Sequence, residues 1–600
     1  MRFVLSRKTG DFTTNSQIFR LSAAALIVGS ACAFIAILLL KTIYFITNVF
    51  FYHRISLTYV TPTNNHLHEW VMLPPIVGAI IIGFIARYGS EKIRGHGIPE
   101  AIEAMLTNES KVHPKVAFWK PISAAISIGS GEPFGAEGPI IMTGGSFGSL
   151  FSQFFHFSSI ERRILLVAGA AGGMAATFAA PVSSVLFAVE LLIFEFKPRS
   201  LVPIAIASAA ADSIRIALIG SGPLFGMPSL PHVTWLLVLV AGVIGVIGSI
   251  LAVLLTYAIY RVEDAFRKLP IHWMWWPAIG AIIIAAGGLI CPRTLGVGYD
   301  SISAMLNAKL TVVTLLTLFI IKTIVWVVAL GSGTSGGILA PILIIGGSLG
   351  GIFGELIHAE HPGMWALLGM SAIFAGVTRT PFTSIVFPLE LTHNLGAMLP
   401  LLITSSIATG ISAYILPRSI LTEKIARRGL HLTHEYSTDP LAMHYAKEIV
   451  YFPSILIEGQ TSIKEALEIL MQKGISDNWV GITNSKGTWV GLVNTWDIVR
   501  SAKTSADKNV IECVSDAPCI HTGDTAKTAL AAMVKKHVDW TKVVSEDGTC
   551  IGALTVSQLL QLRCKERIDE EHRHRVYDMR LRFQKRISLK SNHEKNIHQT

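Results

Sequence analysis

The sequence predicts an all-α polytopic membrane domain followed by a soluble α/β module. Three observations carry this prediction: long apolar runs, a pattern duplicated at a spacing of about 200 residues, and the loss of apolar character after about residue 428. The 600 residues are 51% hydrophobic and only 15% charged, and the mean hydropathy is +0.52. Soluble globular proteins carry about 25% charged residues, so this chain is far more apolar than they are.

The apolar runs come first along the chain. A helix needs about 20 mostly apolar residues to cross a bilayer, and residues 21–51, 164–189, 236–260 and 310–330 supply such runs with few or no charges. We therefore expect a multi-pass protein of the cell (inner) membrane whose first apolar segment stays in the mature protein. Basic residues gather near the N-terminus and in an Arg-rich tail after Cys564, so we expect both termini in the cytoplasm.

These changes in composition set the expected domain boundaries. They are an N-terminal segment at 1–20, a transmembrane domain at 21–430, two soluble domains at 445–505 and 508–565, and a basic tail at 566–600. For the tail we expect a solvated helix or contact with anionic lipid of the bilayer, and no nucleic acid partner.

Three segments in the first part of the apolar region recur in the second part, in the same order. Residues 138–148, GPIIMTGGSFG, match residues 340–350, APILIIGGSLG. The other matches set Pro181, Ser184, Phe187 and Glu190 against Pro381, Ser384, Phe387 and Glu390, and more weakly residues 95–97 against 296–298. Repeated halves with hydrophobic segments interrupted by Gly and Pro are typical of transporters whose substrate site lies between the halves near mid-membrane.

The soluble part is also duplicated. Residues 460–467 parallel residues 524–530, and residues 486–491 parallel residues 547–552, within short β-like runs that alternate with helical ones. We expect two tandem copies of one small α/β fold.

Cysteine usage and motifs argue against other classes of protein. The six cysteines are scattered without a CxxC pair, and the zinc-protease pattern HExxH is absent. We therefore expect neither a structural disulfide nor a metal site, and no enzyme activity.

Glycine and proline interrupt the apolar region at residues 95–99 (GHGIP), 135–139 (GAEGP) and 336–341 (GGILAP). A broken helix in a bilayer leaves backbone N–H groups unpaired, which is tolerable only where they line a cavity or meet a ligand. Helix N-termini combine such donors with a partial positive charge, so several that converge on one point bind an anion. The alternative is that Gly and Pro only allow close helix packing, but three segments in order favour an anion site.

Glu137 lies between glycines in this apolar setting, where a carboxylate usually marks an ion or proton pathway. We expect a gate that occupies an anion's place when ionised and leaves when protonated; the alternative is a helix-start carboxylate satisfied by backbone N–H groups. His96 either donates to the ion, or attracts it when protonated, or is a satisfied buried histidine. Glu190 and Glu390 occupy equivalent positions in the repeats, so we expect helix-end or packing roles for both.

The three segments resemble the motifs of the CLC family of chloride channels and proton/chloride antiporters, which read GSGIP, G(K/R)EGP and GxFxP, and the match spans nearly the whole chain. The resemblance implies an inverted-repeat helical fold, a homodimer with one pore per subunit, chloride as the ion and Glu137 as the gating glutamate. The anion-binding positions that it implies are Gly95, His96, Gly97, Ile98, Pro99, Gly135, Ala136, Gly138, Pro139, Gly337, Ile338, Leu339, Ala340, Pro341 and Leu421.

The resemblance also identifies the soluble part as a pair of CBS domains, which often bind adenine nucleotides between their halves. Asp497 stands where such pairs hold the ribose, and Gln558 takes this place in the second copy. No cofactor is expected to be required beyond this possible nucleotide.

Four departures from the family pattern fall on the permeation and proton paths. His96 replaces a serine that helps to coordinate the anion, Ala136 replaces a basic residue, Leu421 replaces an inner tyrosine, and Leu191 replaces an internal proton-transfer glutamate. These departures favour a channel or a loosely coupled transporter. A coupled proton/chloride or proton/fluoride antiporter is the alternative, because a proton can arrive through water and Glu195 is expected about one helical turn beyond Leu191.

Two other classes of function fit less well. A membrane-anchored nucleotide sensor has no need of duplicated broken helices around a carboxylate. A divalent-cation transporter needs clustered carboxylates or carbonyls, whereas the apolar region shows isolated Glu residues.

Overall fold

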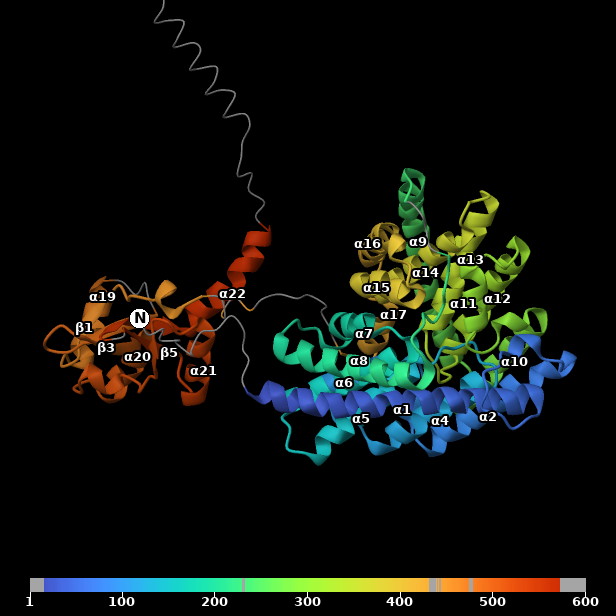
Figure 1. Cartoon of the computed structure of the whole chain (residues 1–600). Coiled ribbons are helices and arrows are strands. Elements are labelled where there is room, and N and C mark those ends of the chain that lie inside the picture. Colours follow the sequence, from blue (N-terminus) through green and yellow to red (C-terminus); the bar gives the residue numbers. More distant parts are fainter. Residues whose placement is uncertain are drawn as a thin grey trace, which may run out of the picture. The chain divides into compact units, whose positions relative to one another are not determined.

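The structure is a computed structural model that describes residues 16–228, 233–430, 439, 441, 444–473, 478–545 and 547–571. The chain divides near residue 436 into a helical membrane unit and a smaller unit with two sheets (Figure 1). The expected N-terminal segment and basic tail lie mostly outside the described residues.

The membrane unit is built from two successive series of eight α-helices within the described residues. The first series is α1 (Gln17–Tyr52), α2 (Leu73–Tyr88), α3 (Ile98–Thr107), α4 (Pro114–Gly129), α5 (Glu137–Phe154), α6 (Ser159–Phe178), α7 (Pro181–Phe187) and α8 (Pro198–Ile219). The second series is α9 (Trp235–Arg267), α10 (Trp276–Ile290), α11 (Tyr299–Leu306), α12 (Val312–Gly331), α13 (Leu339–Leu356), α14 (Pro362–Thr378), α15 (Pro381–Thr392) and α16 (Met398–Ile415). A last helix, α17 (Ile420–Ala426), follows them.

Eight helical segments among the described residues are long and apolar enough to cross a membrane. They include α1, α9 and α12, which contain most or all of three of the expected runs. The run at 164–189 is not one helix: α6 ends at Phe178, and α7 starts at Pro181, which suits the first turn of a new helix. The unit therefore combines long spanning helices with broken ones.

Glycines allow the central helices of each half to pack at close range. A Cβ on Gly144 of α5 would lie 2.3 Å from the carbonyl oxygen of Gly169 in α6, and a Cβ on Gly346 of α13 would lie 2.3 Å from that of Gly369 in α14. From Ile164 onward α6 is buried on all sides. The duplicated GGSxG pattern thus serves helix packing in the core.

The two halves contact each other reciprocally through Glu190 and Glu390. The Glu190 carboxylate accepts from the backbone N–H of Thr383 at 2.8 Å and from its hydroxyl, at the start of α15. The Glu390 carboxylate accepts from the N–H of Ser183 at 2.7 Å and from its hydroxyl, at the start of α7. Each half caps a helix of the other, as a two-fold relation between them requires, and the expected helix-end role of both glutamates is confirmed.

The smaller unit contains two copies of one three-stranded fold, as expected. In the first copy, β1 (Leu456–Glu458) pairs parallel with β2 (Trp479–Thr483), which pairs antiparallel with β3 (Trp489–Asn494). The second copy repeats this order with β4 (Cys519–His521), β5 (Trp540–Val544) and β6 (Cys550–Thr555). Their helices are α19 (Ile463–Lys473) and α20 (Thr495–Thr504), then α21 (Ala526–Lys536) and α22 (Val556–Glu571).

The two copies meet at an apolar contact. Leu492 of β3 lies in one buried cluster with Trp540 of β5 and Ala553 of β6. The rings of Trp489 and Trp540 are edge to face, with centroids 6.0 Å apart. Because apolar side chains from both copies share this cluster, the copies form one packed body.

Candidate anion site

Backbone contacts bring the three glycine-rich segments together. The N–H of Gly95 donates at 3.2 Å to a carbonyl in the loop just before the third segment. The N–H of Gly135 donates to the carbonyl of Gly337 at 3.2 Å, and the N–H of Gly337 returns a bond of 2.9 Å. A Cβ on Gly138 would lie 1.9 Å from the carbonyl oxygen of His96. Segments far apart in the sequence therefore meet at one point.

Each segment leads into the N-terminus of a helix. Helix α3 begins at Ile98, α5 at Glu137 and α13 at Leu339. Gly97, directly before α3, has a φ of 90°, which side chains disfavour. The first N–H groups of a helix have no intrahelical partner and carry partial positive charge. Three such helix starts around one point can bind an anion without a formal cation.

Glu137 lies at the centre of this arrangement. Its side chain is 0% exposed, and neither carboxylate oxygen has a hydrogen-bond partner among the described residues. A Cβ on Gly135 would lie 1.7 Å from one of these oxygens, and a Cβ on Gly337 would lie 2.7 Å from it. The carboxylate therefore occupies the space between the second and third segments. The N–H groups of Glu137 itself and of Ala340 lie near this carboxylate without forming a hydrogen bond to it.

The other predicted site residues are buried in the same unit. His96 is 2% exposed, and its ring Nδ1 has no partner in the described part of the chain. Ala136, just before α5, is 0% exposed, as is Leu421 in α17, a helix that packs against α3. The remaining buried positions are Ile98, Pro99, Pro139, Ile338, Leu339, Ala340 and Pro341.

Sequence reasoning missed two buried lysines that hold the loops of the site. Lys120 of α4 and Lys322 of α12 are both 0% exposed. The Lys120 ammonium donates to the carbonyl of Gly95 at 2.6 Å and to the carbonyl two residues earlier at 2.7 Å. The Lys322 ammonium donates to the carbonyl of Gly296 at 3.2 Å and to the carbonyl two residues earlier at 2.8 Å. A lysine at matching places of the two halves, within the helices α4 and α12, is the signal that identifies them.

The sequence suggested that Glu195 could take the place of the proton-transfer carboxylate that is missing at Leu191, and this suggestion needs correction. Leu191 is buried in the short helix η4 (Ala188–Ile193) and brings no titratable group. The expectation that Glu195 lies one helical turn beyond Leu191 was wrong, because the helix ends before Phe194, which has a φ of 52°. Glu195 is instead paired with Lys197 at 2.9 Å.

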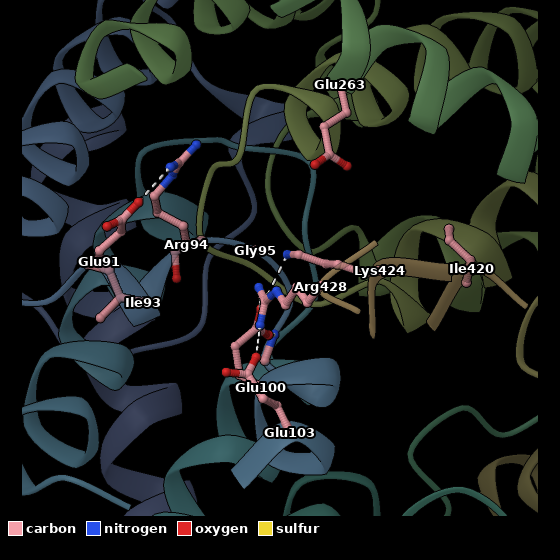
Figure 2. A network of polar contacts seen from close by, with 12 residues as sticks. Glu91, Ile93, Arg94, Gly95, Glu100, Glu103, Glu263, Ile420, Lys424 and Arg428 are labelled. Atoms are coloured by element: carbon pink, nitrogen blue, oxygen red, sulfur yellow. Dashed lines mark hydrogen bonds and ion pairs between the residues drawn. The ribbon is translucent and has the colours of Figure 1, made fainter. Parts of the chain in front are cut away.

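A cavity of about 850 Å³ reaches the first segment at Gly95. Its walls carry eight lysine and arginine side chains and four glutamates, an imbalance that raises the local concentration of anions. Figure 2 shows Lys424 pointing toward the Gly95 segment, and a Cβ on Gly95 would lie 2.1 Å from its ammonium nitrogen. The cavity is therefore a suitable entrance for an anion.

Glu100 ties this entrance to the helix that forms the site (Figure 2). Its carboxylate lies 3.3 Å from the ammonium of Lys424 and 2.9 Å from the guanidinium of Arg428, which also pairs with Glu103. It also accepts the N–H of Gly97 at 2.9 Å. The segment around α17 is thereby fastened to the N-terminus of α3.

In the smaller unit, the two predicted nucleotide positions have different surroundings. Asp497 lies in the first turn of α20, and its side chain is exposed. Gln558 lies in the first turn of α22, where its side-chain oxygen accepts from the N–H of Thr555 at 2.9 Å and from its hydroxyl at 3.1 Å. The carboxylate of the first copy is open to a ligand, whereas the amide of the second caps its own helix.

Models of known families match both the membrane part and the soluble part of the chain. The family model described as "Voltage gated chloride channel" matches residues 77–413, and the CBS domain model matches residues 509–564. The chain is 30% identical over 428 residues to the H(+)/Cl(-) exchange transporter ClcA of Vibrio vulnificus, covering 63% of this chain and 88% of the relative. It is 31% identical over 348 residues to the ClcA of Vibrio cholerae serotype O1, covering 54% and 73%.

Solved structures show the same fold. A slow cyanobacterial Cl−/H+ antiporter matches with a TM-score of 0.60 at 23% identity, covering 68% of this chain and 98% of that one. A eukaryotic CLC transporter matches with a TM-score of 0.58 at 18% identity, covering 90% and 99%. These likenesses confirm the predicted fold class.

Proposed function

The chain belongs to the voltage-gated chloride channel family of multi-pass membrane transport proteins, and from this premise we propose that it exchanges chloride for protons across the membrane, with Glu137 as the gate. Transport of anions is the function that the family shares. Chloride as the ion, its coupling to protons and the roles of single residues go beyond that shared function.

Support for exchange comes from the relatives, which are named H(+)/Cl(-) exchange transporters. They favour the antiporter alternative over the channel or loosely coupled transporter that the departures from the family motifs suggested. Leu191 is the observation that supports the second candidate, weak coupling, because it leaves the inner side without a carboxylate at that position.

One observation carries the gate: the Glu137 carboxylate lies without hydrogen bonds in the space between Gly135 and Gly337. When ionised, it takes the place of an anion among the helix N-termini. When protonated, it loses its attraction to those helix ends and leaves the place to chloride. The backbone carbonyl of His96 lies against Gly138, and the basic cavity beside Gly95 concentrates anions next to these segments.

The assembly and the soluble module complete the proposed function. The family resemblance supports a homodimer with one pore per subunit, in the inner membrane. The surplus of basic residues near both ends supports cytoplasmic termini. The exposed carboxylate of Asp497 supports binding of an adenine nucleotide, through which the CBS pair regulates transport.

The test is flux through the purified protein in liposomes, with chloride and pH recorded together under a chloride gradient and no proton gradient. The parent protein is expected to drive protons against their gradient, and its chloride flux is expected to rise as external pH falls. The Glu137→Ala variant is expected to pass chloride at a rate that no longer depends on pH and without moving protons.

Glu132→Gln is the matched control. Glu132 is also 0% exposed and has no hydrogen-bond partner among the described residues, so this variant removes a similar buried carboxylate that precedes the second segment in the sequence. It is expected to keep the pH dependence. If chloride flux through Glu137→Ala still depends on pH as in the parent, the gate assignment is wrong. Chloride flux without proton movement in the parent protein would mean that it is a channel.

A further inference from the structure

Tyr299 presents an unsatisfied hydroxyl inside the membrane unit. It is the first residue of α11 and follows Gly298, which has a φ of 77°. Edge-to-face contacts with Phe178 and Phe225, at centroid distances of 6.4 and 5.6 Å, fix its ring. Its hydroxyl is buried and has no hydrogen-bond partner in the described part of the chain. A buried hydroxyl without a partner is unfavourable, so a ligand or a movable group is expected to accept its proton.

The Tyr299 hydroxyl faces the carboxylate of Glu137, whose oxygens are equally without partners. Its own N–H, the N–H of Ala340 and the ammonium of Lys322 also lie near this carboxylate. Lys322 already donates to two backbone carbonyls. Tyr299 is therefore a side-chain donor from the second half that is available to the carboxylate.

Two other tyrosines, Tyr44 and Tyr59, lie in the neighbourhood of the Tyr299 hydroxyl. Their rings pack edge to face on each other at a centroid distance of 5.2 Å. Neither is among the groups that face Glu137, which makes them suitable for comparison with Tyr299.

We propose that the Tyr299 hydroxyl is part of the ion site: it is the side-chain donor that lies next to the Glu137 carboxylate while the gate occupies the pore, and it donates to the transported halide once the carboxylate has left. This inference rests on the proposed role of Glu137 as a gate. An anion that takes the place of the Glu137 carboxylate has the same neighbours as the carboxylate. The Tyr299 hydroxyl therefore lies next to either of them.

A phenol suits both tasks. As a neutral donor it stabilises an anion without the strong attraction of a cation, and passage requires binding weak enough for the ion to leave. His96 and Leu421 bring no hydroxyl to the other predicted positions. Tyr299 supplies this chemistry from the half of the unit opposite to Glu137.

Tyr299→Phe is the sharpest test, because it removes one oxygen and keeps the ring contacts. Chloride affinity is measured by calorimetry and by the chloride dependence of flux, in the Glu137→Ala background, where the anion has the site to itself. The added Tyr299→Phe change is expected to weaken chloride binding about three- to tenfold, as loss of one hydrogen bond does. Tyr44→Phe in the same background is expected to leave the affinity unchanged.

In the otherwise unaltered protein, Tyr299→Phe is expected to move the midpoint of the pH dependence of flux to higher pH. Without its donor, the ionised carboxylate is less stable in the pore, so the gate leaves at a lower proton concentration. Unchanged affinity and an unchanged midpoint, in a variant that unfolds at the parent temperature, would overturn the role of Tyr299. Flux through Glu137→Ala that still titrates would overturn the gate instead, and the chloride affinity would still test the hydroxyl.

Discussion

The two halves of the membrane unit use the same residues to hold the fold and different residues to handle the ion. Lys120 and Lys322 each hold the carbonyls of the loop before a glycine-rich turn. Glu190 and Glu390 each cap a helix of the other half. Identity at equivalent positions therefore marks a structural role.

The ion site is asymmetric by contrast. In the alignment of the halves, His96 corresponds to Val297, and Glu137 corresponds to Leu339. Tyr299 corresponds to Ile98. A duplicated scaffold thus carries one unduplicated site, because a gate and its donors have to approach a single ion from different sides.

The buried lysines give the largest expected effect. Lys120→Met and Lys322→Met each leave two backbone carbonyls without their donor in a buried place, so each is expected to lower the free energy of unfolding by about 3 kcal/mol. The measurement is thermal unfolding of the purified protein in detergent, supported by the fraction that elutes as folded protein.

Lys424→Met is the control for this pair, because Lys424 is partly exposed at the cavity. It is expected to change stability far less and to reduce the rate of chloride entry instead. A large loss of stability from only one of the two buried lysines would show that the halves are not equivalent at this position.

The reciprocal caps give the next effect. Glu190→Gln and Glu390→Gln keep the shape of the side chain but remove the charge that faces a helix N-terminus, so each is expected to lower stability by about 2 kcal/mol. Thermal unfolding measures this, and combined flux and pH recording measures coupling. An altered ratio of protons to chloride in Glu190→Gln alone would give Glu190 a transport role and break the symmetry.

The sequence predicted the scaffold better than it predicted the site. Duplication, apolar runs and glycine-rich breaks depend on local composition, so the repeated halves, three of the four expected spanning runs and the meeting of the three segments followed from them. Pro181 is a signal for a new helix, but the continuous apolar run at 164–189 led to the expectation of a single spanning helix. Tyr299 and Lys322 were not singled out, because their roles depend on what they face across the fold.

The position of Glu195 shows the same limit. Helical spacing placed it near Leu191, but the chain leaves the helix at Phe194 and turns Glu195 toward Lys197. Helical periodicity predicts which residues are neighbours only within a continuous helix, and no glycine or proline in the sequence between Leu191 and Glu195 marks the end of this one.

The smaller unit also has two copies that differ at one position, and this difference gives the smallest expected effect. Asp497→Ala is expected to weaken binding of ATP, ADP or AMP about tenfold, which corresponds to about 1.4 kcal/mol, in calorimetry on the full-length protein. Gln558→Ala is expected to leave the affinity unchanged, because its side chain is used on Thr555. Asp507→Ala, which removes another exposed carboxylate, controls for the change in charge.

Equal weakening by Asp497→Ala and Asp507→Ala would mean that the nucleotide responds only to the overall charge of the module. Weakening by Gln558→Ala instead would place the ribose in the second copy. Selective loss in Asp497→Ala would show that the soluble pair, like the membrane halves, repeats its scaffold and keeps its ligand chemistry in one copy. A duplicated fold then needs only one changed residue per site to become functional, because the shared residues already hold the backbone in place.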